Sequence, residues 1–163
     1  MRVSFSESFR LPISDVFSYF PTPADWTRLY GLMGEVKELG DGWYSVPLKS
    51  FPFPLVARIT AVEPNQRVRW VFRGFWRGEG EVRFEDVDGV VAVSGYEDIS
   101  VRWLGPLSVL AEKLFLERTF RSIWALGWRR LRRVEAPIGE VETIKGGGIG
   151  AAEPESRMSE RAQ

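Results

Sequence analysis

The chain contains no cysteine and no histidine. Without cysteine it can form neither disulfides nor thiolate metal sites, and it has no cysteine nucleophile. Without histidine it lacks the usual general base and the commonest zinc ligand, so Ser-His and Cys-His catalytic arrangements are excluded. We therefore expect no metal site and no cofactor, and the standard hydrolase chemistries are ruled out.

An excess of charge of either sign is also missing. The 163 residues include 22 Lys+Arg and 22 Asp+Glu, so the composition gives no reason to expect a nucleic-acid partner. There is no apolar run of about 18 residues, as a membrane-spanning helix would need. The first residues also lack the apolar core of a signal peptide, which predicts a cytoplasmic protein.

What is present is enough apolar sequence for one folded domain. The hydrophobic share is 44% and the charged share 27%, which excludes the intrinsically disordered class. The composition changes near Pro137, because residues 136–163 hold no aromatic side chain and include Gly146-Gly147-Gly148. We expect a folded domain over residues 1–135 and a flexible tail over residues 136–163.

Hydropathy patterns predict the elements of that domain. Residues 2–9 alternate between apolar and polar side chains, as a half-buried strand does, and two short helical stretches follow, beginning at Pro12 and Ala24. An amphipathic helix is predicted from Phe120 to Val134. Between them, turn signals separate six further strands at about 34–39, 42–50, 54–63, 67–77, 79–87 and 90–102.

The turns also predict how the strands pair. Each short hairpin loop fixes one register, and all three registers place the apolar residues on one face of the sheet. The predicted pairs are Val87 with Val90 across Asp88-Gly89, Phe72 with Phe84 across a loop centred on Gly78, and Trp70 with Ile59 across Pro64-Asn65.

On that face, bulky rows give way to rows of glycine. Gly74 and Gly95 fall in one row with Val82, and Gly80 falls in the next. A helix laid across this face would leave a cavity at the glycine end, bordered by Trp76 and Glu97. The alternative is that the glycines mark bulges or bends where the sheet curls.

The order of elements resembles the START-like, or SRPBCC, superfamily over residues 1–135. Three segments carry the likeness: Phe9-Arg10-Leu11-Pro12-Ile13-Ser14-Asp15-Val16-Phe17 at the start, the hairpin from Gly80 to Val90, and Gly105-Pro106-Leu107 ahead of an arginine-rich helix. The resemblance implies an α+β helix-grip fold. In it, a seven-stranded curved antiparallel sheet grips a long C-terminal helix around an apolar pocket, with two short helices after the first strand.

The same resemblance implies several functions. Members bind lipids, sterols or polyketides, some cyclise polyketides, and one branch resembles an accessory protein of carbon monoxide dehydrogenase. Our leading hypothesis is non-enzymatic binding or carriage of a hydrophobic small molecule, lipid or polyketide-like. The alternatives are a polyketide cyclase or aromatase type of enzyme without a metal, and a protein-interaction or accessory module related to the carbon monoxide dehydrogenase branch.

The candidate site residues follow from the predicted pocket. Aromatic and aliphatic walls with few polar groups are typical of small-molecule sites, although the same residues could fill a solid core. Glu97 is a candidate catalytic acid or base if burial raises its pKa, and the favoured alternative is a glutamate that reaches solvent or pairs with Arg118. The candidate ligand-binding residues are Trp70, Phe72, Gly74, Trp76, Val82, Phe84, Gly95, Phe120, Ile123 and Trp124.

Two further features concern partners. Arg118, Arg121, Arg129 and Arg133 fall on the polar side of the predicted helix. They either form a solvated face that complements the helix dipole or bind an acidic protein or an anionic membrane. The loop at 51–54 is a candidate pocket lid, oligomer contact or local fold-back. The sequence leaves the oligomeric state open.

Overall fold

A computed structural model describes residues 1–49, 51, 53–101 and 117–135 of the chain. It confirms the predicted fold class, because seven antiparallel strands form one sheet in the order β1-β7-β6-β5-β4-β3-β2. The strands are β1 (Arg2–Phe9), β2 (Lys37–Glu38), β3 (Trp43–Val46), β4 (Leu55–Glu63), β5 (Arg67–Arg73), β6 (Trp76–Val87) and β7 (Val90–Val101). The helices are α1 (Ile13–Phe17), α2 (Thr27–Tyr30) and α4 (Glu117–Glu135).

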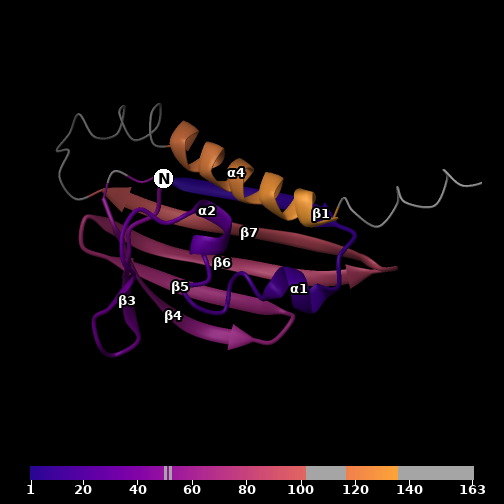
Figure 1. The fold of residues 1–163 in the computed structure, drawn as a ribbon, viewed down its shortest axis with the longest axis horizontal. Helices are drawn as coiled ribbons and strands as arrows, with labels where there is room; N and C mark the ends of the chain where they lie inside the picture. Colours follow the sequence, from indigo (N-terminus) through magenta and orange to yellow (C-terminus); the bar gives the residue numbers. More distant parts are fainter. Residues whose placement is uncertain (50, 52, 102–116, 136–163) are drawn as a thin grey trace, which may run out of the picture.

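All three helices lie on one side of the curved sheet (Figure 1). The long helix α4 runs beside β1 and packs against both β1 and α2. The apolar residues on its inner face recur at helical spacing and are buried, as the amphipathic pattern predicts, and they include both Trp124 and Trp128, whereas Val134 at the end of the helix is 51% exposed. The predicted tail at 136–163 lies outside the described residues. Among the helices that the structure describes, none is long and apolar enough to cross a membrane.

Two of the three predicted registers are confirmed. Val87 pairs with Val90 across the β6–β7 turn, where Asp88 has a positive φ of 54°. On the other side of the sheet, Ile59 pairs with Trp70 in the β4–β5 hairpin, just before a register irregularity. Alternation along these strands therefore places the predicted apolar face toward the helices.

The third register is wrong. The β5–β6 turn lies at Gly74-Phe75 instead of Gly78, and Gly74 adopts the positive φ of 93° that favours glycine in a tight turn. Phe72 therefore pairs with Gly78 and not with Phe84. The partner changes by an even number of positions, so the same side chains still face inward. Trp76 consequently belongs to β6 rather than β5.

Of the two alternatives for the glycine rows, the void is wrong at Gly80 and Gly95. The space over Gly95 is occupied by the ring of Phe5 from β1, and the space over Gly80 by the ring of Trp70 from β5, so a Cβ at either glycine would overlap that ring. The missing side chains thus admit large rings from neighbouring strands, and the sheet face is packed at both positions.

Gly95→Ala tests this packing. The new Cβ would lie about 2.6 Å from the Phe5 ring and would also meet the backbone oxygen of Glu81. Overpacking of this kind costs about 3 kcal/mol of unfolding free energy at a site that cannot yield. Urea denaturation measures the loss, and Ser94→Ala, at the exposed neighbouring position, should stay within about 0.5 kcal/mol of wild type. Equal stability of the two variants would contradict the packing of Phe5 over Gly95.

Candidate functional site

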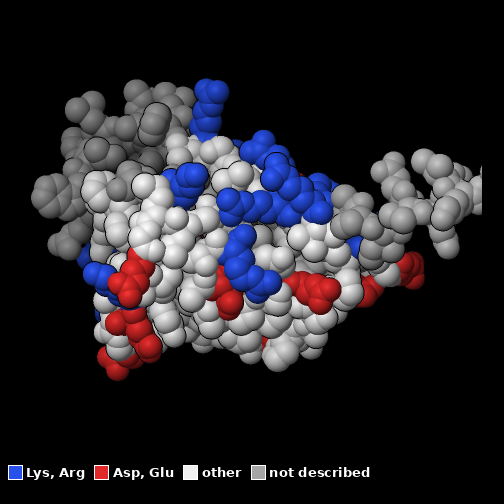
Figure 2. All heavy atoms as spheres, viewed as in Figure 1, with Lys and Arg blue, Asp and Glu red and all other residues white. Residues whose placement is uncertain are grey.

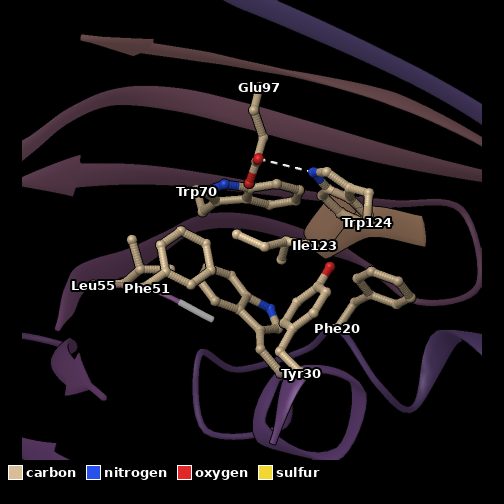
Figure 3. Close-up of a pocket in the computed structure, with 9 residues that line it drawn as sticks. Phe20, Tyr30, Phe51, Leu55, Trp70, Glu97, Ile123 and Trp124 are labelled. Carbon is tan, nitrogen blue, oxygen red and sulfur yellow. Dashed lines mark hydrogen bonds between the residues drawn. The ribbon is translucent and has the colours of Figure 1, made fainter. Parts of the chain in front are cut away.

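A cavity of about 20 Å³ lies between the sheet and the helices. Figure 3 shows its wall, in which strand residues face helix residues across the space. Strands β4, β5 and β7 contribute Leu55, Trp70 and Glu97, and α4 contributes Ile123 and Trp124. The remaining wall residues come from the segments around α1 and α2 and from the β3–β4 loop, and they are Phe20, Trp26, Tyr30 and Phe51.

The sheet brings Trp70 and Glu97 together although they are two strands apart. Gly80 lies between them, paired with Trp70 on one side and with Glu97 on the other. Since Gly80 has no side chain, the Trp70 indole extends over it toward the carboxyl group (Figure 3). This glycine therefore determines how closely the two groups approach.

A second glycine positions the opposite wall. Gly127 lies on the inner face of α4, where an added Cβ would lie 2.9 Å from the Tyr30 ring. The absence of that Cβ lets α2 pack closely on α4. Tyr30 then meets Trp124 edge to face, with ring centroids 5.8 Å apart and planes at 87°.

Glu97 is buried, with 7% of its surface exposed. The Trp124 Nε1–H donates a hydrogen bond of 2.9 Å to its Oε2. The Trp70 Nε1–H faces the same carboxyl group (Figure 3) but makes no hydrogen bond of ordinary geometry within the described part of the chain. Glu97 therefore neither reaches solvent nor forms an ion pair with any described arginine, which corrects the favoured alternative from the sequence.

Burial raises the pKa of Glu97 to about 7, because the apolar wall disfavours the charged form. The N–H groups of Trp124 and Trp70 favour the carboxylate and offset part of that effect. Burial, together with the charge of Glu97, raises the pKa of Tyr30 well above its usual value, so this hydroxyl stays protonated. Near neutral pH the cavity thus holds a carboxyl group that can exchange a proton beside a neutral phenol.

The other buried acid, Glu81, has the opposite electrostatics. It lies on the outer face of the sheet with 2% of its surface exposed, and it is paired with Arg69 and Arg83. Burial alone would raise its pKa, but the hydrogen bonds from these two guanidinium groups leave the pKa lowered. Glu81 is therefore a charged structural residue, whereas Glu97 is a group that titrates near neutral pH in an aromatic pocket.

The structure places four of the candidate residues in the cavity wall: Glu97, Trp70, Ile123 and Trp124. Five others are buried in the surrounding core without lining the cavity: Phe72, Trp76, Val82, Phe84 and Phe120. The two glycines are corrections to the predicted ligand-binding set. Gly74 lies in the β5–β6 turn, and Gly95 is covered by Phe5.

Sequence reasoning missed Phe20, Trp26 and Tyr30 as wall residues. They lie on or beside very short helices, where no periodicity indicates which way a side chain points. Phe51 belongs to the loop considered as a lid. Its ring centroid lies 5.2 Å from that of Phe120, and the residue borders the cavity.

Comparison with known proteins identifies the fold. No family model and no curated protein matches the sequence. Solved structures do match. A conserved protein from Geobacillus kaustophilus superposes with a TM-score of 0.65 at 12% identity, covering 83% of this chain and 95% of its own. A START superfamily protein from Mycobacterium smegmatis superposes with a TM-score of 0.57 at 9% identity, covering 82% and 96%.

The chain has the START-like helix-grip fold. A third match is the Aha1 dimer from Colwellia psychrerythraea, with a TM-score of 0.55 at 12% identity and coverage of 86% and 99%. Identities this low establish the architecture alone, so the site must be interpreted from its own residues. Among the residues that the structure describes, no cluster of three or more acids could hold a metal ion in this helix-grip fold.

The pKa of Glu97 predicts a pH-dependent stability. Its folded-state pKa of about 7 exceeds the unfolded value near 4.5, so the folded chain holds this proton more tightly. Stability from this group is therefore fully present below pH 4.5 and is lost as the pH rises through about 7. The loss amounts to about 3 kcal/mol. Glu97→Gln removes it, so the variant should gain that much relative to wild type between pH 4.5 and 8 in urea denaturation.

Glu81→Gln is the matched control. Because the pKa of Glu81 is lowered, its contribution is present at neutral pH and is lost as the pH falls. This variant should therefore lose stability relative to wild type as the pH rises, which is the opposite sign. A difference between Glu97→Gln and wild type that does not change with pH would contradict the burial of an ionisable Glu97.

Proposed function

We propose that this protein binds and carries a hydrophobic small molecule in the cavity between the sheet and α4, without changing it chemically. The observation that carries the proposal is the composition of the wall. Eight aromatic or aliphatic side chains surround a single acidic group, Glu97. Small-molecule sites have this character, with apolar walls that bind and few polar groups that orient the ligand.

The cavity is too small to hold a hydrophobic ligand in its present form. A volume of about 20 Å³ holds roughly one water molecule, so a lipid or polyketide requires the wall to open. Phe51 is the wall residue that lies in the β3–β4 loop, and it is partly exposed. We propose that this residue swings outward to admit the ligand.

A second candidate function is supported by Glu97 itself. A carboxyl group with a pKa of about 7 can both donate and accept a proton at neutral pH, as a general acid or base must. An enzyme of the cyclase or aromatase type would use it to enolise or close a bound chain, without a metal. Glu97→Gln would then abolish turnover of the bound chain, whereas carriage alone needs no proton transfer.

The proposal predicts a ligand that copurifies with the protein. Native mass spectrometry after gentle purification should show a stoichiometric adduct, which organic extraction then assigns to a chemical class. Ile123→Phe should remove the adduct, because Ile123 lines the cavity and a larger side chain would fill it. Leu131→Phe is the matched control, since Leu131 is buried on the same helix outside the cavity wall.

Both variants should first be shown to unfold cooperatively. Retention of the adduct in Ile123→Phe would place the ligand elsewhere. A wild-type chain without an adduct, and without a thermal shift from fatty acids, sterols, aromatic polyketides or long-chain alkylammonium ions, would contradict carriage and favour a filled core with an interaction role.

We also propose that the arginine face of α4 docks on an anionic membrane. Figure 2 shows Lys and Arg side chains gathered along this helix. Arg121 pairs with Glu117, whereas Arg118, Arg129 and Arg133 form no ion pair with another described residue. Exposed apolar side chains lie nearby, because a Cβ at Gly31 would lie 3.3 Å from the Arg130 guanidinium, and Gly31 is followed by Leu32 and Met33, which are 43% and 62% exposed. Cations beside exposed apolar residues favour a lipid surface over an acidic protein.

Vesicle sedimentation tests this docking. Wild type should bind vesicles containing phosphatidylserine and should not bind vesicles of phosphatidylcholine alone. Arg129→Glu/Arg133→Glu should weaken binding about tenfold or more, since each charge near the surface contributes on the order of 1 kcal/mol. Arg73→Glu/Arg77→Glu changes the net charge equally on exposed strand positions and should weaken it less. Equal losses in the two variants would contradict a specific docking face.

A further inference from the structure

The cavity wall carries charge of only one sign. Among the described lining residues, Glu97 is the ionisable acid and no lysine or arginine is present. A ligand with a carboxylate at this depth would meet a like charge in an apolar environment, where Coulomb repulsion is strong. A ligand with a positive charge would compensate the buried carboxylate, which has no ion-pair partner among the described residues.

The rest of the wall favours the same ligand chemistry. Six of the nine lining residues are aromatic, and three of these are tryptophans. The rings surround the space in edge-to-face pairs, since Trp26 meets Trp70 at 5.4 Å and 65° while Tyr30 meets Trp124 at 5.8 Å and 87°. Aromatic faces attract cations through their quadrupole, tryptophan most strongly, and such rings bind quaternary ammonium groups.

Building on the proposed carrier function, we infer that this cavity selects hydrophobic ligands that carry an ammonium group, primary to quaternary. Once the wall has opened at Phe51, the ammonium lies against the Glu97 carboxylate and among the rings of Trp26, Tyr30, Trp70 and Trp124. The apolar remainder of the ligand extends past Ile123 and Leu55 toward Phe51. Fatty acids and other carboxylates are excluded by the same charge.

Proton linkage follows from this arrangement. The cation binds the ionised form of Glu97, so its affinity should rise with pH up to about 7 and then level off. Other titratable groups contribute little to this dependence. Among the described residues, Tyr30 from α2 is the titratable group that faces Glu97, and its hydroxyl stays neutral. The neighbours of Glu97 on the other elements do not titrate; they are Val3 on β1, Trp70 on β5, Gly80 on β6 and Trp124 on α4.

The test uses two probes of the same shape. Choline carries a quaternary nitrogen where 3,3-dimethylbutan-1-ol carries a carbon atom, so the pair differs in charge and not in size. Binding is followed by the fluorescence of the wall tryptophans at pH 8 and pH 5. We expect choline to bind at least about tenfold more tightly than the alcohol at pH 8, and this preference to fall severalfold at pH 5.

Glu97→Gln should abolish the preference at pH 8, so that choline and the alcohol bind the variant about equally. The pH 5 measurement neutralises the same carboxyl group in the unmodified chain, so the inference stays testable if the variant does not fold. Equal binding of the two probes at pH 8 overturns the ammonium inference and leaves hydrophobic binding standing. Failure of both probes to bind also overturns the ammonium inference, while carriage is decided separately by the copurifying adduct and the thermal shifts.

Discussion

The hydrogen bond from Trp124 Nε1 to Glu97 joins the long helix to the sheet at the centre of the molecule. This hydrogen bond fixes the rotation of α4 about its own axis, because Trp124 must face β7 for the bond to form. The same indole stacks on Phe5 of β1, with centroids 3.9 Å apart, and on Trp128, 5.0 Å away. A change at Glu97 would therefore be transmitted to the aromatic layer between the helix and the sheet.

The two faces of the sheet each bury one acid, but they hold it in different electrostatic surroundings. Glu81 on the outer face is enclosed by guanidinium groups, which hold it charged. Glu97 on the inner face receives indole N–H groups, which are too weak to offset its burial. An acid held this way is unfavourable for stability alone, since an apolar residue of similar size would avoid its desolvation. A ligand in the cavity that interacts with Glu97 would account for the presence of this acid.

The sequence predicted the fold well because alternation and turn chemistry are local signals. Ile59, Trp70 and Glu97 were placed on the inner face from strand parity, and Trp124 from helical spacing. The β5–β6 register was wrong because Gly74 and Gly78 are both plausible turn glycines. That error changed the pairing by an even number of positions and left the face unchanged.

The details of the cavity were less predictable. Pairing rows indicate which residues neighbour one another but not how far a ring extends, so they left a cavity over Gly80 and Gly95 open as one alternative, whereas Trp70 and Phe5 fill that space. The remaining walls come from irregular segments, such as the one that holds Trp26, whose position depends on tertiary packing. Contacts of that kind have no periodic signature in the chain.

Glu97 is an ionisable group whose pKa an apolar, aromatic cavity raises to about 7. Carbon-13 NMR of the Glu97 side-chain carboxyl, followed across pH 3 to 9, measures its ionisation directly. We predict a titration midpoint of about 7. A midpoint near 4.5, the value of an ordinary solvated glutamate, would contradict the claim.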